Sequence, residues 1–590
     1  MATINDYMQH SHSESTSSFM SSETATATGT WGSTKGGVPV YTTFPPPPIQ
    51  VGPPLLAMGY ANGNTAPTPT ETQGLEMTKT IPPNNINRTL VLCFDGTGDQ
   101  FDADNSNIVE LFSMLKKDDP NKQLVYYQAG IGTYTTPDIA TPMASKISKS
   151  LDMAVAWNLD HHIMGGYEFL MQNYRTNDKI CIFGFSRGAY TARCLAGMIH
   201  KVGLLPSCNH QQVPFAYKMY TQADDDGWRM SNAFKRAFSI DVDIEFLGVW
   251  DTVDSVGLFP RRLPFTASNS VVKIFRHAMA LDERRAKFKP SYWNRPTEDE
   301  KTLSETDRQK RLQLKKLRAE QQNAEHEQAH DKDNKTDKTA AEKDKDFQAA
   351  LKKLELRWAA KRAQETDVEE VWFAGAHCDI GGGSVGDGTS PCLARIPLRW
   401  MLRECFKTKT GILFHIDGIK RVGLDPTRLY PDVLGRPDAL PLDTYTAETS
   451  MIQDIPKSVP KKDDDDDDDE DLLFGVELEE TEEEADLKDA LAPIYDQLSM
   501  KWFWWVLELL PMYVRYQEEK VQEETSQKVW QWSKELQMNL GRGRHVPRQH
   551  AAGVKIHRTV KTRMEAAHKN GTKYKPAVKN LDLEAVTWVD

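Results

Sequence analysis

The sequence has no long apolar run and no regular cysteine spacing, and both absences narrow the class of protein. No uninterrupted apolar stretch approaches the ~20 residues that a helix needs to cross a bilayer. Residues 1–18 lack the apolar core of a secretory signal peptide. The seven cysteines are odd in number and follow no disulfide framework, which indicates a reducing compartment. We therefore expect a cytoplasmic protein that is free in solution or, at most, bound to a membrane surface.

Apolar and basic residues are also scarce. Apolar residues make up 39% of the chain, which is below the ~45–50% of ordinary globular domains. The 72 lysine and arginine residues are outnumbered by 84 aspartate and glutamate residues, so the net charge is -12. A nucleic-acid-binding protein needs a basic face that neutralises phosphates, and we therefore expect no nucleic acid partner. The basic stretch at 542–563 could equally face anionic lipid headgroups or acidic residues of the same chain.

The apolar deficit is concentrated in three polar tracts. Residues 1–86 are rich in Ser, Thr, Gly and Pro, and they cannot bury enough apolar area to offset the entropy of ordering. Residues 297–366 are mostly charged, as in an insertion that loops out of a fold. The aspartate run at 463–469 favours a solvated linker over a metal site, because its like charges repel. The predicted organisation is a disordered tail at 1–86, a main domain at 87–455 with a charged insertion at 297–366, an acidic linker at 456–490, and a helical and basic extension at 491–590 that packs on the main domain.

Between these tracts, apolar strands alternate with amphipathic helices. Residues 89–94 form a continuous apolar run, which is typical of a strand covered on both faces. A helix follows, and either Asn105 or Ser106 can cap it. Further strands are predicted at 123–128, 180–185, 244–250 and 371–376, and further helices around 163–174 and at 187–202. This alternation predicts an α/β-hydrolase-like fold of the α/β class, with a mostly parallel sheet and helices on both of its faces.

The strongest local signal is Gly184-Phe185-Ser186-Arg187-Gly188. An apolar strand runs into this motif and a helix leaves it, which is the context of the sharp turn that presents a nucleophilic serine. Such a turn crowds the positions two before and two after the serine, so glycine is expected at both. An ordinary tight turn that happens to contain serine is the alternative. We interpret Ser186 as the candidate nucleophile.

A nucleophilic serine needs a histidine base that a carboxylate orients, and in this fold class the chain order is Ser, Asp, His. Asp251 directly follows the strand at 244–250, and Asp254 competes with it three residues later. His377 directly follows the strand at 371–376. His277 is the alternative base, but it stands in a stretch, 276–285, that we predict to be helical and that suits a buried structural histidine. We therefore favour Asp251 and His377.

The loop after the first strand is the second part of the predicted site. The oxyanion of an acyl-transfer reaction needs two N–H donors. We expect them from the backbone of Arg187 and from the loop that holds Gly96 and Thr97. Phe94-Asp95-Gly96-Thr97 also suggests an aspartate-nucleophile phosphatase, but Cys93 occupies the position of the nucleophile. The run His377-Cys378-Asp379 suggests a metal pair without further ligands at supporting spacing, so we expect neither a metal nor a cofactor.

Residues 500–511 concentrate aromatic side chains after the acidic tract. Trp502, Trp505 and Leu509 stand at the spacing of one helix face, which favours a core helix packed on the sheet. The alternative is a lid or interfacial anchor beside the site, because the tryptophan ring is apolar while its N–H can still bind a polar partner.

Taken together and in order, these motifs resemble one known family. They are Phe94-Asp-Gly-Thr97, Gly184-Phe-Ser-Arg-Gly-Ala189, Trp250-Asp-Thr-Val253, His277-Ala-Met-Ala-Leu-Asp-Glu-Arg284, and Trp372-Phe-Ala-Gly-Ala-His377 before Asp-Ile-Gly-Gly-Gly383. The family is the α/β-hydrolase domain family that includes the phospholipase effectors of type VI secretion. The resemblance covers about 88–296 and 367–406, and the surroundings of Trp504 and Ile556 resemble the C-terminal part of its fungal members.

The resemblance implies a catalytic role for the main domain at 87–455. In that family a serine, an aspartate and a histidine form a triad, and they correspond to Ser186, Asp251 and His377. Asp254 departs from the small residue that is usual there. The favoured function is a serine hydrolase that cleaves carboxylic esters, with a phospholipid or other ester as substrate and with possible contact to a membrane surface. The alternative is a catalytically inactive interaction protein that keeps the fold.

Overall fold

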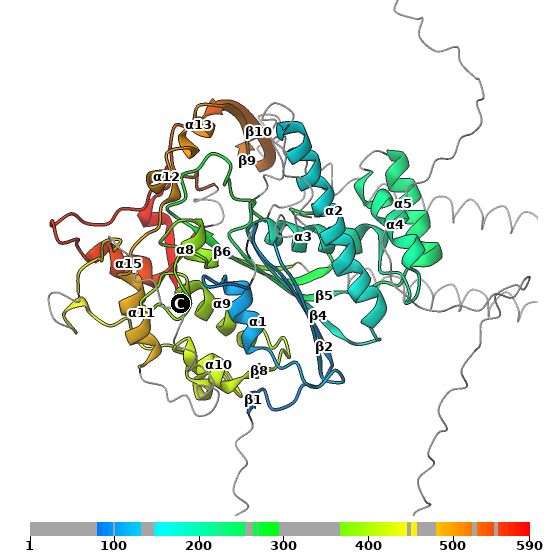
Figure 1. Cartoon of the computed structure of the whole chain (residues 1–590), viewed down its shortest axis with the longest axis horizontal. Helices are drawn as coiled ribbons and strands as arrows, with labels where there is room; N and C mark the ends of the chain where they lie inside the picture. The colour runs from blue at the N-terminus through cyan, green and yellow to red at the C-terminus, as the bar shows by residue number, and fades with distance from the viewer. Residues whose placement is uncertain are drawn as a thin grey trace, which may run out of the picture. The chain divides into compact units, whose positions relative to one another are not determined.

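The structure is a computed structural model of the 590-residue chain (Figure 1). Two compact units can be distinguished, 1–74 and 75–590. Residues 1–78 of the predicted tail at 1–86, and nearly all of the predicted insertion at 297–366, lie outside the described residues. The prediction of disorder is wrong at the end of the tail, because Thr80–Ile81 form a strand that pairs with Phe414–His415. The described residues are 79–97, 99, 101–130, 147–222, 225–253, 263–267, 269–293, 366–444, 450–456, 480–521, 528–547 and 553–590.

An eight-stranded sheet lies at the centre of this unit, and every neighbouring pair in it is parallel. The order across the sheet is β12-β11-β7-β6-β5-β4-β2-β3. Its strands are β2 (Thr89–Phe94), β3 (Gln123–Gln128), β4 (Lys179–Phe185), β5 (Ile244–Trp250), β6 (Val272–Ala280), β7 (Asp367–Phe373), β11 (Val554–His557) and β12 (Val586–Val589). Two antiparallel pairs stand apart from it, β1 (Thr80–Ile81) with β8 (Phe414–His415), and β9 (Pro511–Val521) with β10 (Lys528–Met538).

Helices cover both faces of the sheet, as the sequence predicts. The helices on one face are α2 (Ile147–Asn173), α3 (Ser186–Val202), α4 (Val213–Thr221) and α5 (Asp225–Phe238). On the other face lie α1 (Asn107–Met114), α9 (Arg395–Lys407) and α10 (Ile416–Arg421). The remaining short helices are α8 (His377–Gly381), α11 (Glu482–Ala490), α12 (Gln497–Met500), α13 (Trp504–Glu508) and α15 (Arg558–Glu565), with single 3-10 turns at His210–Gln212, Pro426–Arg428, Leu442–Thr444 and Leu583–Ala585.

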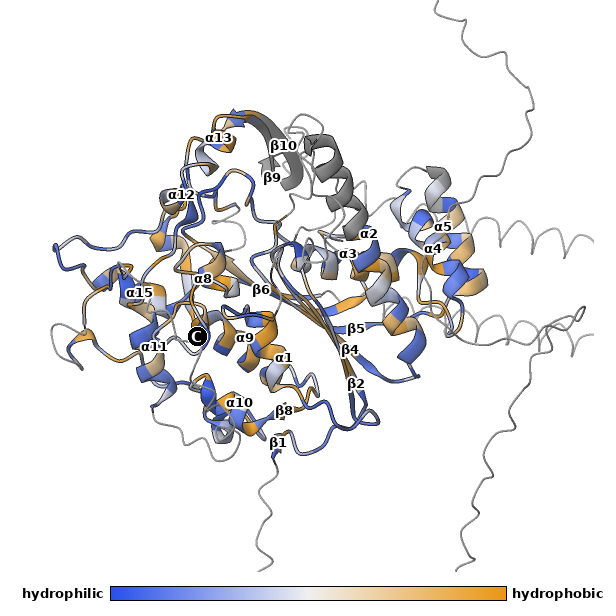
Figure 2. Ribbon diagram, viewed as in Figure 1, coloured by the Kyte–Doolittle hydropathy of each residue, from blue (hydrophilic) through white to orange (hydrophobic). Residues whose placement is uncertain are grey.

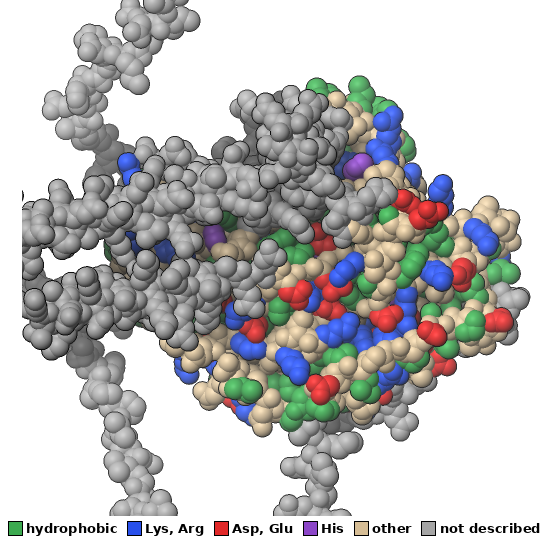
Figure 3. Space-filling view, turned by 180° about the vertical axis from the view of Figure 1, so that it is seen from behind, with side chains coloured by type: hydrophobic (Ala, Val, Ile, Leu, Met, Phe, Trp, Pro, Cys, Tyr) green, Lys and Arg blue, Asp and Glu red, His purple; other side chains and the backbone are tan. Residues whose placement is uncertain are grey.

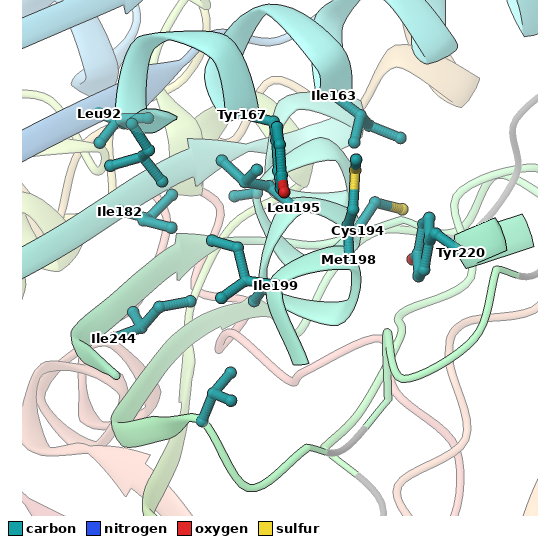
Figure 4. Packing of buried hydrophobic residues seen from close by; sticks show 14 of the residues in the cluster. Leu92, Ile163, Tyr167, Ile182, Cys194, Leu195, Met198, Ile199, Tyr220 and Ile244 are labelled. Atoms are coloured by element: carbon teal, nitrogen blue, oxygen red, sulfur yellow. The ribbon is translucent and has the colours of Figure 1, made fainter. Parts of the chain in front are cut away.

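The hydrophobic core has one layer on each face of the sheet. Figure 4 shows the layer beneath α2 and α3, where strand side chains meet helix side chains. The labelled residues are Leu92, Ile182 and Ile244 from the strands, Ile163 and Tyr167 from α2, Cys194, Leu195, Met198 and Ile199 from α3, and Tyr220 from α4. Helices α10, α11 and α15 are far more hydrophilic than the strands of the central sheet (Figure 2). This two-layer burial explains why the strands are continuous apolar runs in the sequence.

The chain reverses its direction of winding at β2. It passes from β2 to the edge strand β3 and then returns to β4 on the other side of β2. In open parallel sheets, ligands bind at such a switch point, beyond the carboxyl ends of the strands. The loop after β2 and the start of α3 after β4 meet there, so the topology brings Asp95 and Ser186 to the same edge of the sheet.

The prediction of a helix at 276–285 is wrong. His277 lies in β6, which pairs with β5 on one side and β7 on the other. Alanine and methionine favour a helix when the chain is considered locally, but pairing on both edges and burial on both faces override that preference here.

The predicted acidic linker at 456–490 is also too long. Residues 482–490 form α11, which Thr481 caps, and most of this helix is buried. Three of its carboxylates face arginines of α9: Asp486 and Asp489 lie 2.6 and 2.8 Å from Arg399, and Glu482 lies 2.9 Å from Arg403. In the sequence these acidic residues look like part of a solvated run, but in the fold they form ion pairs with buried arginine side chains. The aspartate run at 463–469 lies outside the described residues.

The prediction of a core helix at 500–511 is wrong as well. Trp502, Trp505 and Leu509 are exposed, and the helix is the short α13. Glu508 is the residue of this segment that is buried. In the described part of the chain, no helix has the length and apolar character needed to cross a membrane.

The C-terminal region differs from the helical extension that we expected at 491–590. It adds β11 and β12 to the central sheet, and β11 pairs with β7. Its side chains also form a third hydrophobic cluster with Trp372 and Leu281 of the main domain. A four-residue strand is too short to be recognised from alternation, which is why the sequence did not indicate it.

This arrangement predicts that the C-terminal strands unfold together with the rest of the sheet. Ile556 of β11 is fully buried, so Ile556→Ala should lower the free energy of unfolding by about 2–5 kcal/mol. Thr587→Ala, at an exposed position of β12, is the matched control. Urea unfolding followed by circular dichroism should show one transition at lower denaturant for Ile556→Ala. A separate early transition, with the main transition unmoved, would contradict the prediction.

Candidate active site

A tight turn between β4 and α3 presents Ser186. The serine has a left-handed backbone, with φ of 57°. A Cβ atom at Gly184 would lie 2.6 Å from the Cα of Ala189, and one at Gly188 would lie 2.3 Å from the carbonyl oxygens of Phe94 and Asp95. Both contacts are with backbone, which cannot move aside cheaply. The expectation that glycine is required on both sides of the serine is therefore met by the geometry of the turn.

The structure brings Ser186, His377 and Asp251 into one hydrogen-bonded chain. The Oγ of Ser186 lies 2.7 Å from Nε2 of His377, and Nδ1 of His377 lies 2.5 Å from Oδ2 of Asp251. Asp251 follows β5 directly, with φ of 40°, while His377 begins α8 four residues after the end of β7. Ser186 is 5% exposed and the other two are similarly buried. Water is thus largely excluded from these two hydrogen bonds.

The carboxylate of Asp251 is saturated with donors. Its Oδ1 accepts from the backbone N–H of Ala280 at 2.9 Å and from Nη1 of Arg544 at 2.5 Å. Its Oδ2 accepts from Nη2 of Arg544 at 2.8 Å and from His377. Burial by itself raises the pKa of Asp251, but the charge of Arg544 and these hydrogen bonds outweigh burial and hold the pKa well below its ordinary range. Asp251 is therefore ionised.

Two aromatic rings contact the imidazole of His377. The rings of Phe185 and Phe288 each have a centroid 4.8 Å from it, the first tilted and the second edge-on. Its backbone N–H points to Glu283, which in turn binds Arg285. Burial lowers the pKa of His377, and the charge of Arg285 adds to this, against the opposing effect of Asp251. The histidine is therefore held in its neutral form.

The competing histidine, His277, is not part of this chain of hydrogen bonds. His277 is fully buried, accepts a hydrogen bond from the N–H of Thr252 at 3.1 Å, and contacts Glu370 at 3.1 Å. It therefore ties the residues after β5 to β7. Asp254 lies outside the described residues.

The loop after β2 is fixed by the carboxylate of Asp95. Asp95 accepts hydrogen bonds from Ser106 at 2.6 Å and Tyr127 at 2.7 Å, and from the N–H of Gly96 at 2.8 Å. The Gly96 N–H, which we expected as an oxyanion donor, is thus engaged by Asp95. Thr97 is exposed, and Arg187 lies in the first turn of α3, where backbone N–H groups have no acceptor within the helix.

Asp379 organises the loop after His377. It accepts hydrogen bonds from the N–H groups of Ala376 at 2.9 Å and Tyr495 at 3.0 Å. Burial, the largest effect, raises the pKa of Asp379 to about 7. Among the described residues, no group of three or more His, Cys, Asp or Glu side chains is arranged to hold a metal ion.

The sequence reasoning missed Arg544 and Glu283. Arg544 was part of the basic stretch at 542–563, which we attributed to lipid headgroups or to acidic residues of this chain, and the structure assigns this arginine to Asp251. The two residues are 293 positions apart. A basic residue in a polar stretch carries no local signal of burial, so only the fold could connect them.

Comparison with known proteins identifies one family model that matches this chain and one similar yeast protein. Residues 88–404 match the family described as T6SS phospholipase effector Tle1-like, catalytic domain. An uncharacterized protein of Saccharomyces cerevisiae is 28% identical over 539 residues, which cover 78% of this chain and 77% of that protein.

Two solved structures are more distant. A crystal structure of an uncharacterized protein from Pseudomonas aeruginosa has 17% identity and a TM-score of 0.28, and the match covers 59% of this chain and 49% of that one. The Tle1 effector bound to the VgrG spike from the type 6 secretion system has 20% identity and a TM-score of 0.20, and the match covers 35% of this chain and 47% of that one. This chain thus spans about half the length of each solved chain.

The parallel sheet with helices on both faces defines an α/β-hydrolase-like protein. Within that class, the chain belongs to the family of Tle1-like phospholipase effector catalytic domains. The matched range, 88–404, contains Ser186, Asp251 and His377 but ends before Arg544.

The crowding at the turn predicts a large effect of one methyl group. Gly188→Ala should lower the free energy of unfolding by about 1–3 kcal/mol, because the new Cβ meets two backbone oxygens. Gly435→Ala is the control, since nothing lies within 4 Å of a Cβ at that position. Thermal or urea unfolding of the two variants provides the measurement. Equal stability of both variants would contradict the geometry of the turn.

Proposed function

We propose that this protein is a serine hydrolase that cleaves carboxylic esters. The observation that carries the proposal is the continuous chain from the Oγ of Ser186 through His377 to the ionised Asp251. Serine is a weak nucleophile at neutral pH, and it becomes reactive when an adjacent base can take its proton. A buried, neutral histidine at 2.7 Å is such a base.

In the proposed reaction, the Oγ of Ser186 bonds to the carbonyl carbon of the ester while Nε2 of His377 takes the hydroxyl proton. Asp251 holds the tautomer with Nδ1–H and stabilises the imidazolium. The tetrahedral intermediate breaks its bond to the leaving alcohol, which receives the proton from His377. A water molecule then attacks the acyl-enzyme with the same base, and the acid and free Ser186 are released. The N–H of Arg187 and the loop at Thr97 are the proposed oxyanion donors.

The proposed substrate class is the acyl ester of a phospholipid. Membership of a phospholipase effector family supports it. The alternative, an inactive interaction protein with the same fold, would have no chemical need for the complete chain of Ser186, His377 and Asp251. Binding alone also gives no reason for a serine in a left-handed backbone conformation.

An exposed apolar surface beside the site supports a lipid substrate further. We call it the apolar cap, and it consists of Trp502, Phe503, Trp505, Val506 and Leu509. Trp502 is 79% exposed and Leu509 is 60% exposed. Figure 3 shows hydrophobic side chains gathered at the top of the molecule, where Figure 1 places α13. Clustered exposed apolar groups of this kind mark interaction surfaces in proteins.

The charges around the cap suit the headgroups of a membrane. Within residues 499–511 the charged side chains are Lys501, which is exposed, and Glu508, which is buried. Glu508 accepts hydrogen bonds from Ala286 and Asn539, so its charge faces the protein. The cap therefore presents tryptophan, aliphatic groups and a cation, as interfacial segments do. We propose that it contacts the surface of a lipid bilayer.

The proposed nucleophile can be tested without knowledge of the substrate. Ser186→Ala should abolish labelling by a fluorophosphonate probe and ester turnover, with the melting temperature nearly unchanged. Ser113→Ala, at an exposed serine of α1, should label as the wild type does. In-gel fluorescence with a soluble p-nitrophenyl ester assay provides both measurements. Labelling that persists in Ser186→Ala would exclude Ser186, and an unlabelled wild type would favour the inactive alternative.

The apolar cap should matter for lipid but not for soluble esters. Trp502→Ser combined with Leu509→Ser should reduce binding to vesicles that contain anionic phospholipid by about tenfold or more, because each buried apolar side chain contributes roughly 1.5–3 kcal/mol. Leu434→Ser, at another exposed leucine, is the matched control. Vesicle sedimentation and turnover of a short soluble ester provide the two measurements. An equal loss of vesicle binding and of ester turnover, with a lowered melting temperature, would mean that the cap residues contribute to stability and not to lipid binding.

A further inference from the structure

Arg544 reaches the proposed catalytic chain from outside the family match. It makes two parallel hydrogen bonds to the two oxygens of Asp251, at 2.5 and 2.8 Å. Both side chains are buried, at 1% and 0% exposure. A planar guanidinium that faces a carboxylate in this way fixes the orientation of the carboxylate as well as its charge.

The same arginine is fixed in its turn by the main domain. Its Nε and Nη2 donate to the carbonyl oxygen of Phe288 at 3.1 and 2.7 Å, and its Nη1 also donates to the carbonyl oxygen of Ala280. Phe288 is the residue whose ring packs on His377. Arg544 therefore contacts the aspartate and the loop that confines the histidine at once. These five hydrogen bonds from one guanidinium are more than is needed to neutralise the one buried charge of Asp251.

Other charged groups also face this centre. Glu283 and Arg285, from the loop after β6, influence His377 together with Asp251. Lys289 lies near Arg544 and Glu283, and His277 of β6 lies near Asp251. Glu283 and Arg285 bind each other at 2.8 Å, so their charges largely cancel. Arg544 is the cation that contacts Asp251 directly.

We propose that Arg544 is a positioning residue of the active site, and that the C-terminal segment is therefore required for catalysis. This inference rests on the proposed function. Arg544 holds Asp251 so that Oδ2 meets Nδ1 of His377, and its charge offsets that of the carboxylate. An uncompensated carboxylate would attract a proton onto the imidazole. Arg544 thus extends to lower pH the range in which His377 is neutral and can accept the serine proton.

The direction of the pH effect follows from this arrangement. Ser186 is activated when His377 is neutral, so reactivity rises as the pH passes upward through the pKa of His377. Removal of the Arg544 charge leaves the negative charge of Asp251 uncompensated beside His377, which raises the pKa of His377. The acid limb of the profile should then move to higher pH by about 1 unit or more, as expected for the loss of a nearby charge. A lysine would keep the charge but not the two parallel hydrogen bonds.

The test measures the rate of fluorophosphonate labelling against pH for the full-length wild type, Arg544→Met, Arg544→Lys and Arg542→Met. Arg542 is exposed two positions earlier and is the matched control. For Arg544→Met we expect the midpoint of the acid limb to rise by about 1 unit or more. For Arg544→Lys we expect an unchanged midpoint with a rate lowered about tenfold or more, because the carboxylate is misoriented. Arg542→Met should match the wild type.

The folded fraction is measured by circular dichroism at each pH, and rates are compared per folded protein, because unfolding at low pH would otherwise imitate a shift of the limb. If Arg544→Met yields no folded protein, Arg544→Lys decides: a lowered rate with the wild-type midpoint supports the inference, and a wild-type rate overturns it. A folded Arg544→Met with an unmoved midpoint also overturns it. An unlabelled wild type would instead contradict the proposed function, so the two failures are distinguishable.

Discussion

A fully buried carboxylate is the constraint on which the centre of this protein depends. Four hydrogen bonds reach the two oxygens of Asp251. One comes from Ala280 at the end of β6, one from His377 of α8, and two from Arg544 of the C-terminal segment. Loss of one partner of a buried ion pair costs about 3–5 kcal/mol. Three distant parts of the chain must therefore converge on one point for the carboxylate to be tolerated, and their convergence also builds the proposed active site.

The parts that could be predicted from the sequence are those with a local signature. Continuous apolar runs revealed β2, β4 and β5, because strands buried on both faces have no polar side to alternate with. The glycines around Ser186 revealed the turn, because a Cβ would clash at either position. Asp251 and His377 could be chosen since chemistry gathers where parallel strands end, although their roles remain proposals. Asp251 was preferred to Asp254 only by its adjacency to the strand.

The parts that could not be predicted depend on partners far away in the sequence. The alanine and methionine residues of β6 suggest a helix until both neighbouring strands are known. Glutamates and aspartates of α11 resemble a solvated run until Arg399 and Arg403 face them. Arg544 belongs to the same class, because a buried arginine and an exposed arginine look alike in a sequence. In each case the deciding energy is an interaction between elements, not a preference of the residue itself.

The aromatic segment connects the surface of the molecule to its centre. Trp504 packs edge-on against Phe288 at 5.6 Å, and Phe288 packs against His377 at 4.8 Å. Glu508 anchors the same short helix to the backbone of Ala286, two residues before Phe288. The apolar cap and the histidine thus share one loop as their support. A displacement of this loop would therefore move both the short helix that carries the cap and the ring that contacts His377.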